Sequence, residues 1–179
     1  DRLEAVVKDL DMISKLETKD VNPVMENFNL LDLIQNIFDI LDLKSSKKGI
    51  TVRFAQFHQF PIIVNADKEK IEQVLLNLIE NSIKYGRVNG FTEVRIDESQ
   101  LGRVRVDIVD NGEGMDKQHL NRVFERFYRV EKSRNRDQGG SGLGLSIVKH
   151  ILEAHNQEIS VKSKVGKGSE FSFYLNKGV

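Results

Sequence analysis

The stretch "DQGGSGLGLSIVKHIL", residues 137–152, places Gly139, Gly140, Gly142 and Gly144 directly before an amphipathic run. A P-loop needs Lys and then Ser or Thr after its last glycine, and a leucine and a serine follow here. A dinucleotide-binding fingerprint needs a further glycine and a preceding buried strand, whereas the preceding "VEKSRNRDQ" is charged and non-periodic. The glycines therefore form either a flexible loop or another kind of phosphate cradle at the start of a helix.

The composition is that of an ordinary soluble globular protein. The chain has 179 residues, 39% of them hydrophobic and 30% charged, with 27 basic against 27 acidic side chains. This zero net charge argues against nucleic acid as a partner, and the absence of cysteine excludes disulfides and thiolate metal sites. No apolar run approaches the roughly 20 residues of a membrane helix, and no signal peptide is visible. Because the chain starts at Asp1 within a helical pattern, we expect a fragment of a longer protein.

The N-terminal segment carries a narrow apolar stripe. Leu3, Val6, Leu10 and Ile13 follow one another at alternating spacings of three and four residues, which is typical of a coiled-coil or helix-hairpin seam. Pro23 ends this pattern, because the residue before a proline is disfavoured in helical geometry. We therefore separate a short helical segment from the domain that follows.

The rest of the chain alternates between helical and strand patterns. Asn29 and Asp67 are expected to be N-caps of two helices, over residues 30–48 and 68–85. Two further helices are expected over 119–127 and 143–154, and strands over 50–54, 61–66, 92–97, 103–110, 158–163 and 169–175. This order predicts an α+β domain in which a mixed sheet carries helices on one face.

The helix over 68–85 contains "NLIENSIKY", in which Asn77, Asn81, Lys84 and Tyr85 can face one side. Asparagine is a poor helix former, so two asparagines within an apolar helix need a reason. A solvated polar stripe and a polar binding surface both remain open on this segment alone.

A second polar site, "DNGEGM", follows the strand over 103–110. Asp110 supplies a carboxylate where the strand leaves the sheet, a usual place for ligand recognition. Gly112 and Gly114 permit a tight turn or the close approach of backbone before Met115. An ordinary Asn-Gly turn is the competing interpretation.

Between this turn and the glycine-rich stretch lies the basic, aromatic segment "FERFYRVEKSRNR". Its basic residues are Arg126, Arg129, Lys132, Arg134 and Arg136, with the aromatic residues Phe124, Phe127 and Tyr128. A charge run is usually a solvated surface. Here it precedes backbone N–H groups at 142–144 that can hold an anion. In a chain of zero net charge, we interpret it as counter-charge for phosphates.

The order of these motifs resembles a known family. Asn-x3-Asn-x2-Lys-Tyr, Asp-x-Gly-x-Gly, Phe-x-x-Phe and Gly-x-Gly-Leu-Gly resemble the N, G1, F and G2 boxes of bacterial sensor histidine kinases, over about residues 28–175. The resemblance implies the ATP-binding (Bergerat-type) fold shared with type II topoisomerases, Hsp90 and MutL. This fold is a two-layer α/β sandwich with a mixed, mainly antiparallel sheet. Residues 1–20 would then end the second helix of a dimerisation hairpin. Residues 21–179 would form the catalytic domain, with an ATP lid at about 115–141.

The resemblance also implies roles for single residues. Asn81 resembles the Mg²⁺ ligand, with catalytic roles shared by Asn81, Lys84 and Arg129, the last two at the phosphates. Asp110 would accept a hydrogen bond from the adenine amino group, and Ser169 would bind the same base edge. The remaining nucleotide-binding residues are expected to be Asn77, Tyr85, Gly112, Gly114, Met115, Phe127, Lys132, Gly140, Ser141, Gly142, Leu143, Gly144 and Leu145.

One position separates a kinase from a hydrolase of the same fold. In the ATP-hydrolysing relatives, a glutamate at the place of Asn77 activates water, and an asparagine takes up no proton. Transfer to a neutral imidazole needs mainly positioning and charge neutralisation, so a kinase is favoured. A hydrolase is the alternative, with Glu80 as a conceivable base but foremost a surface residue. A nucleotide-binding module without catalysis is the third hypothesis.

The phosphoacceptor of the family is a His followed by an acidic residue. The four histidines here, His58, His119, His150 and His155, lie in "FHQF", "QHLN", "KHIL" and "AHNQ", and none fits. We therefore expect structural or surface roles for them and an acceptor on an upstream hairpin. By resemblance, the phosphoryl group passes on to a response regulator receiver domain. The intact protein would be a homodimeric membrane sensor with this part in the cytoplasm; the oligomeric state of the fragment stays open.

Overall fold

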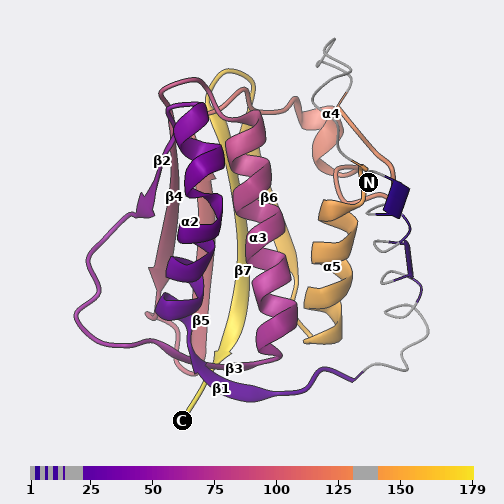
Figure 1. Ribbon diagram of the computed structural model, residues 1–179. Helices are drawn as coiled ribbons and strands as arrows, with labels where there is room; N and C mark the ends of the chain where they lie inside the picture. Colours follow the sequence, from indigo (N-terminus) through magenta and orange to yellow (C-terminus); the bar gives the residue numbers. More distant parts are fainter. Residues whose placement is uncertain (1–2, 5–6, 8–9, 12–13, 15–21, 131–140) are drawn as a thin grey trace.

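The computed structural model describes residues 3–4, 7, 10–11, 14, 22–130 and 141–179 (Figure 1). The described residues before position 15 are helical. The other helices are α2 (Leu30–Lys47), α3 (Lys68–Tyr85), α4 (Lys117–Leu120) and α5 (Gly144–Ala154). The strands are β1 (Glu26–Asn29), β2 (Thr51–Phe54), β3 (Ile63–Ala66), β4 (Phe91–Asp97), β5 (Arg103–Asp110), β6 (Ile159–Lys164) and β7 (Gly168–Lys177).

In the part of the chain that the structure describes, seven strands form a mixed sheet in the order β1-β3-β7-β5-β4-β2, with β6 also paired to β7. Among the described strands, β2 and β4 pair in parallel and the other neighbours are antiparallel. Helices α2, α3 and α5 cover one face of this sheet (Figure 1). The predicted fold, a two-layer sandwich with a mainly antiparallel sheet and helices on one face, is confirmed.

The core lies between the sheet and the three long helices. On the sheet side, it is formed by the apolar side chains that alternate along the strands. Val104, Val106 and Ile108 of β5 are almost fully buried, and Phe173 of β7 is paired opposite Val106. The intervening side chains form the other face, which is polar: Arg105 pairs with Asp107 there. Burial of each such aliphatic side chain contributes about 1.5–3 kcal/mol, so this alternation fixes which face receives the helices.

Both predicted N-caps are confirmed. The Asn29 side chain accepts a hydrogen bond from the backbone N–H of Leu31 at 3.2 Å, and the Asp67 side chain accepts from Lys70 at 3.1 Å. These bonds satisfy backbone donors that have no partner within a first helical turn. The Asp67 cap starts α3, which carries Asn77, Asn81, Lys84 and Tyr85.

Two elements differ from the sequence-based expectation. Strand β1, "ENFN", was not predicted because it lacks apolar alternation; it forms by pairing with β3. The helix expected over 119–127 was wrong in extent, since α4 covers only Lys117–Leu120 and the following residues form turns. The Asp116 side chain caps α4 from an earlier position, and Phe127 has φ of 60°, which no right-handed helix contains.

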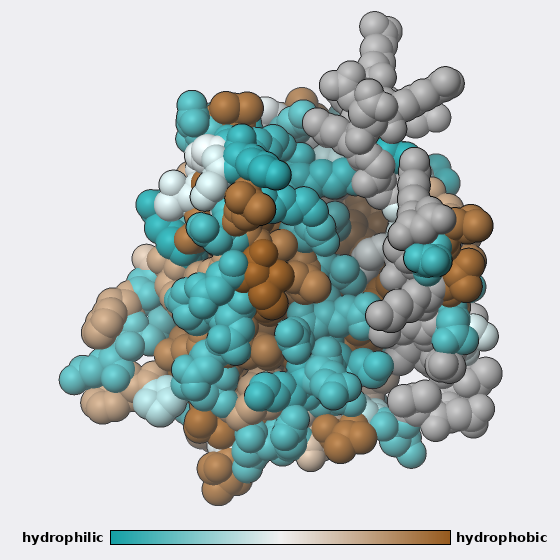
Figure 2. All heavy atoms as spheres, in the orientation of Figure 1, coloured by the Kyte–Doolittle hydropathy of each residue, from teal (hydrophilic) through white to brown (hydrophobic). Residues whose placement is uncertain are grey.

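Polar and charged side chains dominate the outer surface of the helical layer, with separate apolar patches between them (Figure 2). Ile40 and Leu43 of α2 are among the exposed apolar residues. Within the described residues, no helix combines the length and the apolar character needed to cross a bilayer.

Candidate functional site

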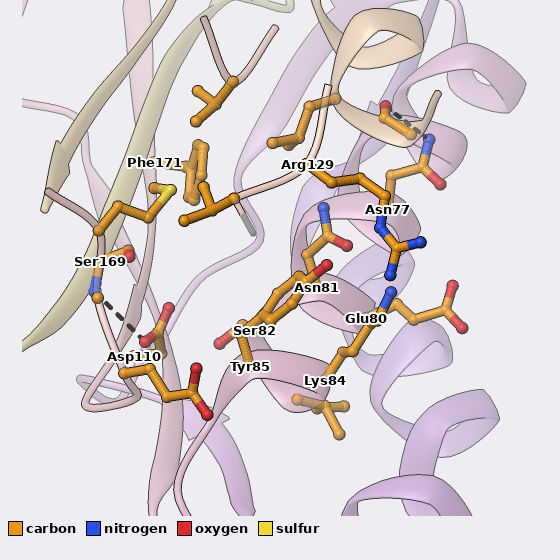
Figure 3. Close-up of a pocket in the computed structure, with 18 of the residues that line it drawn as sticks. Asn77, Glu80, Asn81, Ser82, Lys84, Tyr85, Asp110, Arg129, Ser169 and Phe171 are labelled. Atoms are coloured by element: carbon orange, nitrogen blue, oxygen red, sulfur yellow. Dashed lines mark hydrogen bonds between the residues drawn. The ribbon is translucent and has the colours of Figure 1, made fainter. Parts of the chain in front are cut away.

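A cavity of about 660 Å³ opens beside α3, and the polar side chains of that helix line it (Figure 3). Asn77, Asn81 and Lys84 follow one another at helical spacing and face this cavity, with Tyr85 at the end of the helix. The opposite wall is formed by the end of β5, the turn after it and the start of β7. The cavity therefore joins motifs that lie more than 90 residues apart in the chain.

Asn77 connects α3 to the start of α5. Its side-chain N–H donates to the carbonyl oxygen of Gly144 at 3.4 Å. Lys84 has its ammonium 5.0 Å above the ring of Tyr85. Within the part of the chain that the structure describes, neither Lys84 nor Arg129 forms an ion pair with a carboxylate. Two cations at the cavity wall are thus available for an anionic ligand.

Asp110 lies at the other side of the cavity and is held by backbone groups. It ends β5 directly opposite Ser169 of β7 in the strand register. Its Oδ1 atom accepts hydrogen bonds from the backbone N–H groups of Gly112 at 2.8 Å and Ser169 at 3.3 Å. Burial raises the pKa of this carboxyl above its ordinary range, and the two backbone hydrogen bonds oppose that rise. The second carboxylate oxygen, Oδ2, has no hydrogen-bond partner among the residues described here.

A small hydroxyl network adjoins Asp110. The Ser163 Oγ atom of β6 accepts the backbone N–H of Met115 at 2.8 Å and donates to the carbonyl oxygen of Gly168 at 2.9 Å. It also lies 2.8 Å from the Oγ atom of Ser169. These bonds fix the turn after β5 against the hairpin of β6 and β7.

Two glycines of the motifs are required by close backbone approach. A Cβ atom on Gly114, whose φ is 67°, would lie 2.0 Å from the carbonyl oxygen of Lys164. A Cβ atom on Gly142, with φ of 74°, would lie 2.9 Å from backbone atoms of Phe127. The N–H of Phe127 donates to the carbonyl oxygen of Gly142 at 3.0 Å. Glycine at 142 therefore allows this backbone contact between residues before and after the 131–140 segment.

Most of the residues singled out in the sequence line the same cavity. They are Asn77, Asn81, Lys84, Tyr85, Asp110, Gly114, Met115, Arg129, Ser141, Gly142, Gly144, Leu145 and Ser169. In Figure 3, Asp110 and Ser169 lie on one side, and Asn77, Lys84 and Arg129 on the other. Their roles toward a ligand stay predictions.

Three of the expected residues do not line the cavity. Phe127 is 56% exposed and is absent from the cavity wall, and Leu143 is fully buried in the core before α5. Gly112 packs against the backbone of Tyr85 and acts through its N–H on Asp110. Lys132 and Gly140 lie outside the described residues.

Lys48 is a cavity residue that the motifs missed. Its ammonium donates to the carbonyl oxygens of Ile83 at 3.0 Å and Lys84 at 2.6 Å, the last turn of α3. Burial lowers the pKa of Lys48, and the nearby Glu113 carboxylate opposes this. The sequence "KKG" at the end of α2 indicated a helix end but gave no sign of this contact 35 residues away.

Other lining residues were also missed or placed elsewhere. Glu80, predicted foremost as a surface residue, lines the cavity and forms an ion pair with Lys44. His119 lines the cavity with its Nδ1 atom 2.6 Å from the hydroxyl of Tyr128. The further lining residues are Ser82, Ile83, Glu113, Asp116, Val123, Val130, Val165 and Phe171.

Two other histidines, His155 and His58, pack within the domain. The His155 ring is buried: its Nδ1 lies 2.7 Å from the carbonyl oxygen of Ile151, and its Nε2 accepts the backbone N–H of Asp67 at 3.0 Å. His58 packs edge-on against Phe54 at 5.9 Å. Within the described ranges, no group of three or more His, Asp or Glu side chains is arranged to hold a metal ion.

Comparison with known proteins finds histidine kinases among the relatives of this chain. The chain is 31% identical over 177 residues to hybrid signal transduction histidine kinase B of Dictyostelium discoideum, covering 97% of this chain and 9% of that protein. It is 33% identical over 176 residues to sensor histidine kinase WalK of Bacillus subtilis, covering 98% of this chain and 28% of the relative. The chain thus spans less than a third of the length of these two relatives.

Solved structures share its fold. Full-length ShkA in complex with AMPPNP superposes with a TM-score of 0.86 at 24% identity, covering 99% of this chain and 36% of that one. Histidine kinase ThkA in complex with the response regulator protein TrrA gives a TM-score of 0.77 at 26% identity, covering 99% of this chain and 48% of the ThkA chain. A family model described as "Histidine kinase-, DNA gyrase B-, and HSP90-like ATPase" matches residues 66–179, and the chain belongs to this family.

Proposed function

We propose that this chain is the ATP-binding catalytic domain of a sensor histidine kinase, which transfers the γ-phosphoryl group of ATP to a histidine on a separate helical hairpin. The observation that carries the proposal is the single cavity shared by a strand-end carboxylate, Asp110, and the amides and ammonium of α3. A nucleoside triphosphate presents complementary chemistry, with hydrogen-bond donors at its base and negative charge at its other end. The similarity to histidine kinases over nearly the whole chain supports it.

At the base end, Asp110 and Ser169 would recognise adenine. Because Asp110 Oδ1 already accepts two backbone N–H groups, its second oxygen is left for the exocyclic amino group of the base. Tyr85, with 39% of its side chain exposed, and Met115 would provide apolar contact with the ring.

At the phosphate end, Lys84 and Arg129 would meet the phosphates, while the backbone N–H groups of Gly142 and Gly144 and the start of α5 would add partial positive charge. The N–H of Leu143 already donates to the Oγ atom of Ser141 at 3.2 Å. Mg²⁺ fits this donor set, because a cavity with an amide ligand and, among the described residues, no cage of carboxylates suits an ion that keeps waters and phosphate oxygens. Asn81 would hold it through its amide oxygen, with Asn77 beside the hydrated phosphates. When bound, the ion neutralises phosphate charge.

The residues present favour transfer over hydrolysis. Asn77 takes up no proton, and Glu80 is paired with Lys44. Transfer to a neutral imidazole requires in-line positioning and charge stabilisation more than a strong base. Lys84 and Arg129 would position and stabilise the transferred group while Asp110 fixes the opposite end of the nucleotide.

The partners of this activity would be the histidine hairpin of the same protein and a response regulator receiver domain. ThkA, which shares the fold, is a histidine kinase in complex with a response regulator. The described N-terminal residues are helical, and Leu3, Val7 and Leu10 are exposed, as expected for helix that packs on a hairpin partner. The intact protein would be a homodimeric membrane sensor with this domain on the cytoplasmic side.

A phosphotransfer assay tests the proposal. The chain should bind ATP in a Mg²⁺-dependent manner by calorimetry, acquire no stable acid-labile label from γ-labelled ATP, and label a separately prepared histidine hairpin of its parent protein. Stable acid-labile label on the chain itself would contradict the assignment of the acceptor to the hairpin. Absence of ATP binding would contradict the proposal as a whole.

A hydrolase of the same fold is the second candidate, because Glu80 lines the cavity next to Asn81. Steady phosphate release by the chain alone, lost in Glu80→Ala, would favour it. The kinase proposal expects no such turnover from either the unchanged chain or the variant.

A further inference from the structure

Ser163 lies behind the base end of the cavity, and its hydroxyl makes three contacts. Its Oγ atom is 2.8 Å from the backbone nitrogen of Met115, 2.9 Å from the carbonyl oxygen of Gly168 and 2.8 Å from the hydroxyl oxygen of Ser169. Ser163 does not line the cavity itself, whereas Ser169 does. Any effect of Ser163 on a ligand must therefore pass through its neighbours.

The three contacts determine which way the hydroxyl protons point. A serine hydroxyl has one proton and two acceptor positions. The carbonyl oxygen of Gly168 can only accept, so it takes the proton of Ser163, and the N–H of Met115 fills one acceptor position. The contact with Ser169 therefore has Ser169 as the donor. With its proton committed to Ser163, the Ser169 hydroxyl has only lone pairs to offer to the cavity.

Asp110 presents the same chemistry beside it. An ionised carboxylate only accepts hydrogen bonds, and Asp110 Oδ1 is already used by the backbone N–H groups of Gly112 and Ser169. The base end of the cavity thus offers two side chains, Asp110 and Ser169, that are both acceptors. A base with an amino group at this edge can donate to them, whereas a base with a carbonyl oxygen there would place acceptor against acceptor.

We propose that Ser163 is a specificity-determining positioning residue: by holding Ser169 as an acceptor, it favours 6-aminopurine nucleotides over 6-oxopurine nucleotides. This inference rests on the proposed nucleotide function and adds a residue to it. Without the Ser163 hydroxyl, that of Ser169 is released and can rotate to donate to a carbonyl oxygen. Discrimination between the two base classes should then fall by about threefold to tenfold, the range of one neutral hydrogen bond.

The test compares the affinities of the 179-residue chain for ATP and for inosine triphosphate, whose base carries a carbonyl oxygen in place of the amino group. Calorimetric titrations in Mg²⁺ give the ratio of the two dissociation constants for the unchanged chain, Ser163→Ala, Ser163→Thr and Ser160→Ala. Ser160 is the matched control, because it lies on the same strand and does not line the cavity. Its hydroxyl donates to the carbonyl oxygen of Ser172 in β7 at 3.4 Å. The preference for ATP should fall in Ser163→Ala and persist in Ser163→Thr and Ser160→Ala.

A purely structural role makes a different prediction. If Ser163→Ala weakens both nucleotides by the same factor and keeps their ratio, the inference is wrong even though the residue matters. Thermal unfolding of each variant checks that it folds, and Ser169→Ala keeps the test independent of Ser163→Ala. Ser169→Ala should by itself lower the preference for ATP over inosine triphosphate. A preference unchanged in that variant would also overturn the inference.

A double-mutant cycle isolates the coupling between the two serines. In a Ser169→Ala background, Ser163→Ala should leave the nucleotide ratio unchanged, because the hydroxyl that it orients is gone. A further fall of the same size in that background would show that Ser163 acts by another route. If the unchanged chain binds neither nucleotide, the proposed function fails and this inference with it, an outcome distinct from binding without altered discrimination.

Discussion

The two ends of the cavity are built differently. At the base end, Asp110 and Ser169 are fixed by backbone and hydroxyl hydrogen bonds between adjacent strands. At the phosphate end, the side chains of Asn81, Lys84 and Arg129 make no hydrogen bonds within the ranges that the structure describes, and the side chain of Asn77 makes a single one at 3.4 Å. The comparison teaches that the sheet orders the side chains proposed to bind the base before any ligand is present. The side chains proposed to meet the phosphates have few such partners among the described residues.

The largest effect is expected at the phosphate end. Asn81→Ala removes the amide oxygen proposed to hold Mg²⁺, and ATP affinity in the presence of Mg²⁺ should fall by about 100-fold, or about 2.7 kcal/mol. Calorimetry with Mg²⁺ and with a chelator measures this, and the variant should lose its dependence on the ion. Asn36→Ala, at an exposed position of α2, is the control and should bind as the unchanged chain does. A Mg²⁺ dependence retained in Asn81→Ala would remove Asn81 from the metal site.

A smaller loss is expected at the base end. Asp110→Asn keeps one oxygen for the two backbone N–H groups but presents an amide N–H to the base, so ATP affinity should fall by about 30-fold, or about 2 kcal/mol. Affinity for inorganic triphosphate should not change, because this end does not meet the phosphates. Asp97→Asn, at the exposed end of β4, is the matched strand-end control. Equal losses for ATP and triphosphate would contradict the division of the cavity into two ends.

Local patterns in the sequence were sufficient for strands β2 to β7 and for about half of the residues that line the cavity. The alternation of Val104, Val106 and Ile108 and the cap at Asp67 are local signals, since each depends on neighbouring residues and on one buried face. Together they predicted which face carries the helices and where α3 begins. The spacing of Asn77, Asn81 and Lys84 placed their side chains on one side of that helix, as the structure has them.

The parts that sequence reasoning missed depend on contacts between distant segments. Lys48 reaches carbonyl oxygens at the end of α3, and Ser163 reaches the turn after β5, 48 residues earlier. Neither contact leaves a periodic trace in its own segment. Phe127 was expected at the ligand because the motif contains it, but its positive φ and its backbone bond to Gly142 direct the side chain outward.

Lys48 tests the region between the two ends of the cavity. It contacts the last turn of α3, which carries Lys84 of the phosphate end and Tyr85 of the base end. Lys48→Met leaves the carbonyl oxygens of Ile83 and Lys84 without this donor, so the free energy of unfolding should fall by about 1–2 kcal/mol. Urea unfolding measures it. Lys47→Met, at the neighbouring exposed position, is the matched control and should stay within about 0.5 kcal/mol of the unchanged chain. A loss of the same size in both variants would mean that the helix charge matters and not the contact.

The smallest effect concerns the stability of the free chain and its dependence on pH. Burial raises the pKa of Asp110 in the folded state, so folding favours the protonated form and the native state loses stability as pH rises from the ordinary carboxyl pKa of about 3.9 through the raised value. Asp110→Asn does not ionise and avoids this loss. Without nucleotide, the variant should be more stable than the unchanged chain by roughly 1 kcal/mol near neutral pH.

Urea unfolding of both proteins between about pH 3, below the ordinary carboxyl pKa, and about pH 8 tests this linkage. The difference in unfolding free energy should shrink toward zero at the acidic end, where Asp110 is protonated in both states, and grow as pH rises. A difference that is independent of pH would assign the stabilisation to packing and not to the buried charge. The opposite trend, with the unchanged chain gaining relative stability as pH rises, would mean that the backbone hydrogen bonds of Gly112 and Ser169 outweigh burial. The backbone of the cavity would then stabilise the ionised form of Asp110 before any ligand binds. Presenting this acceptor to a base that donates a hydrogen bond would not lower the free energy of unfolding.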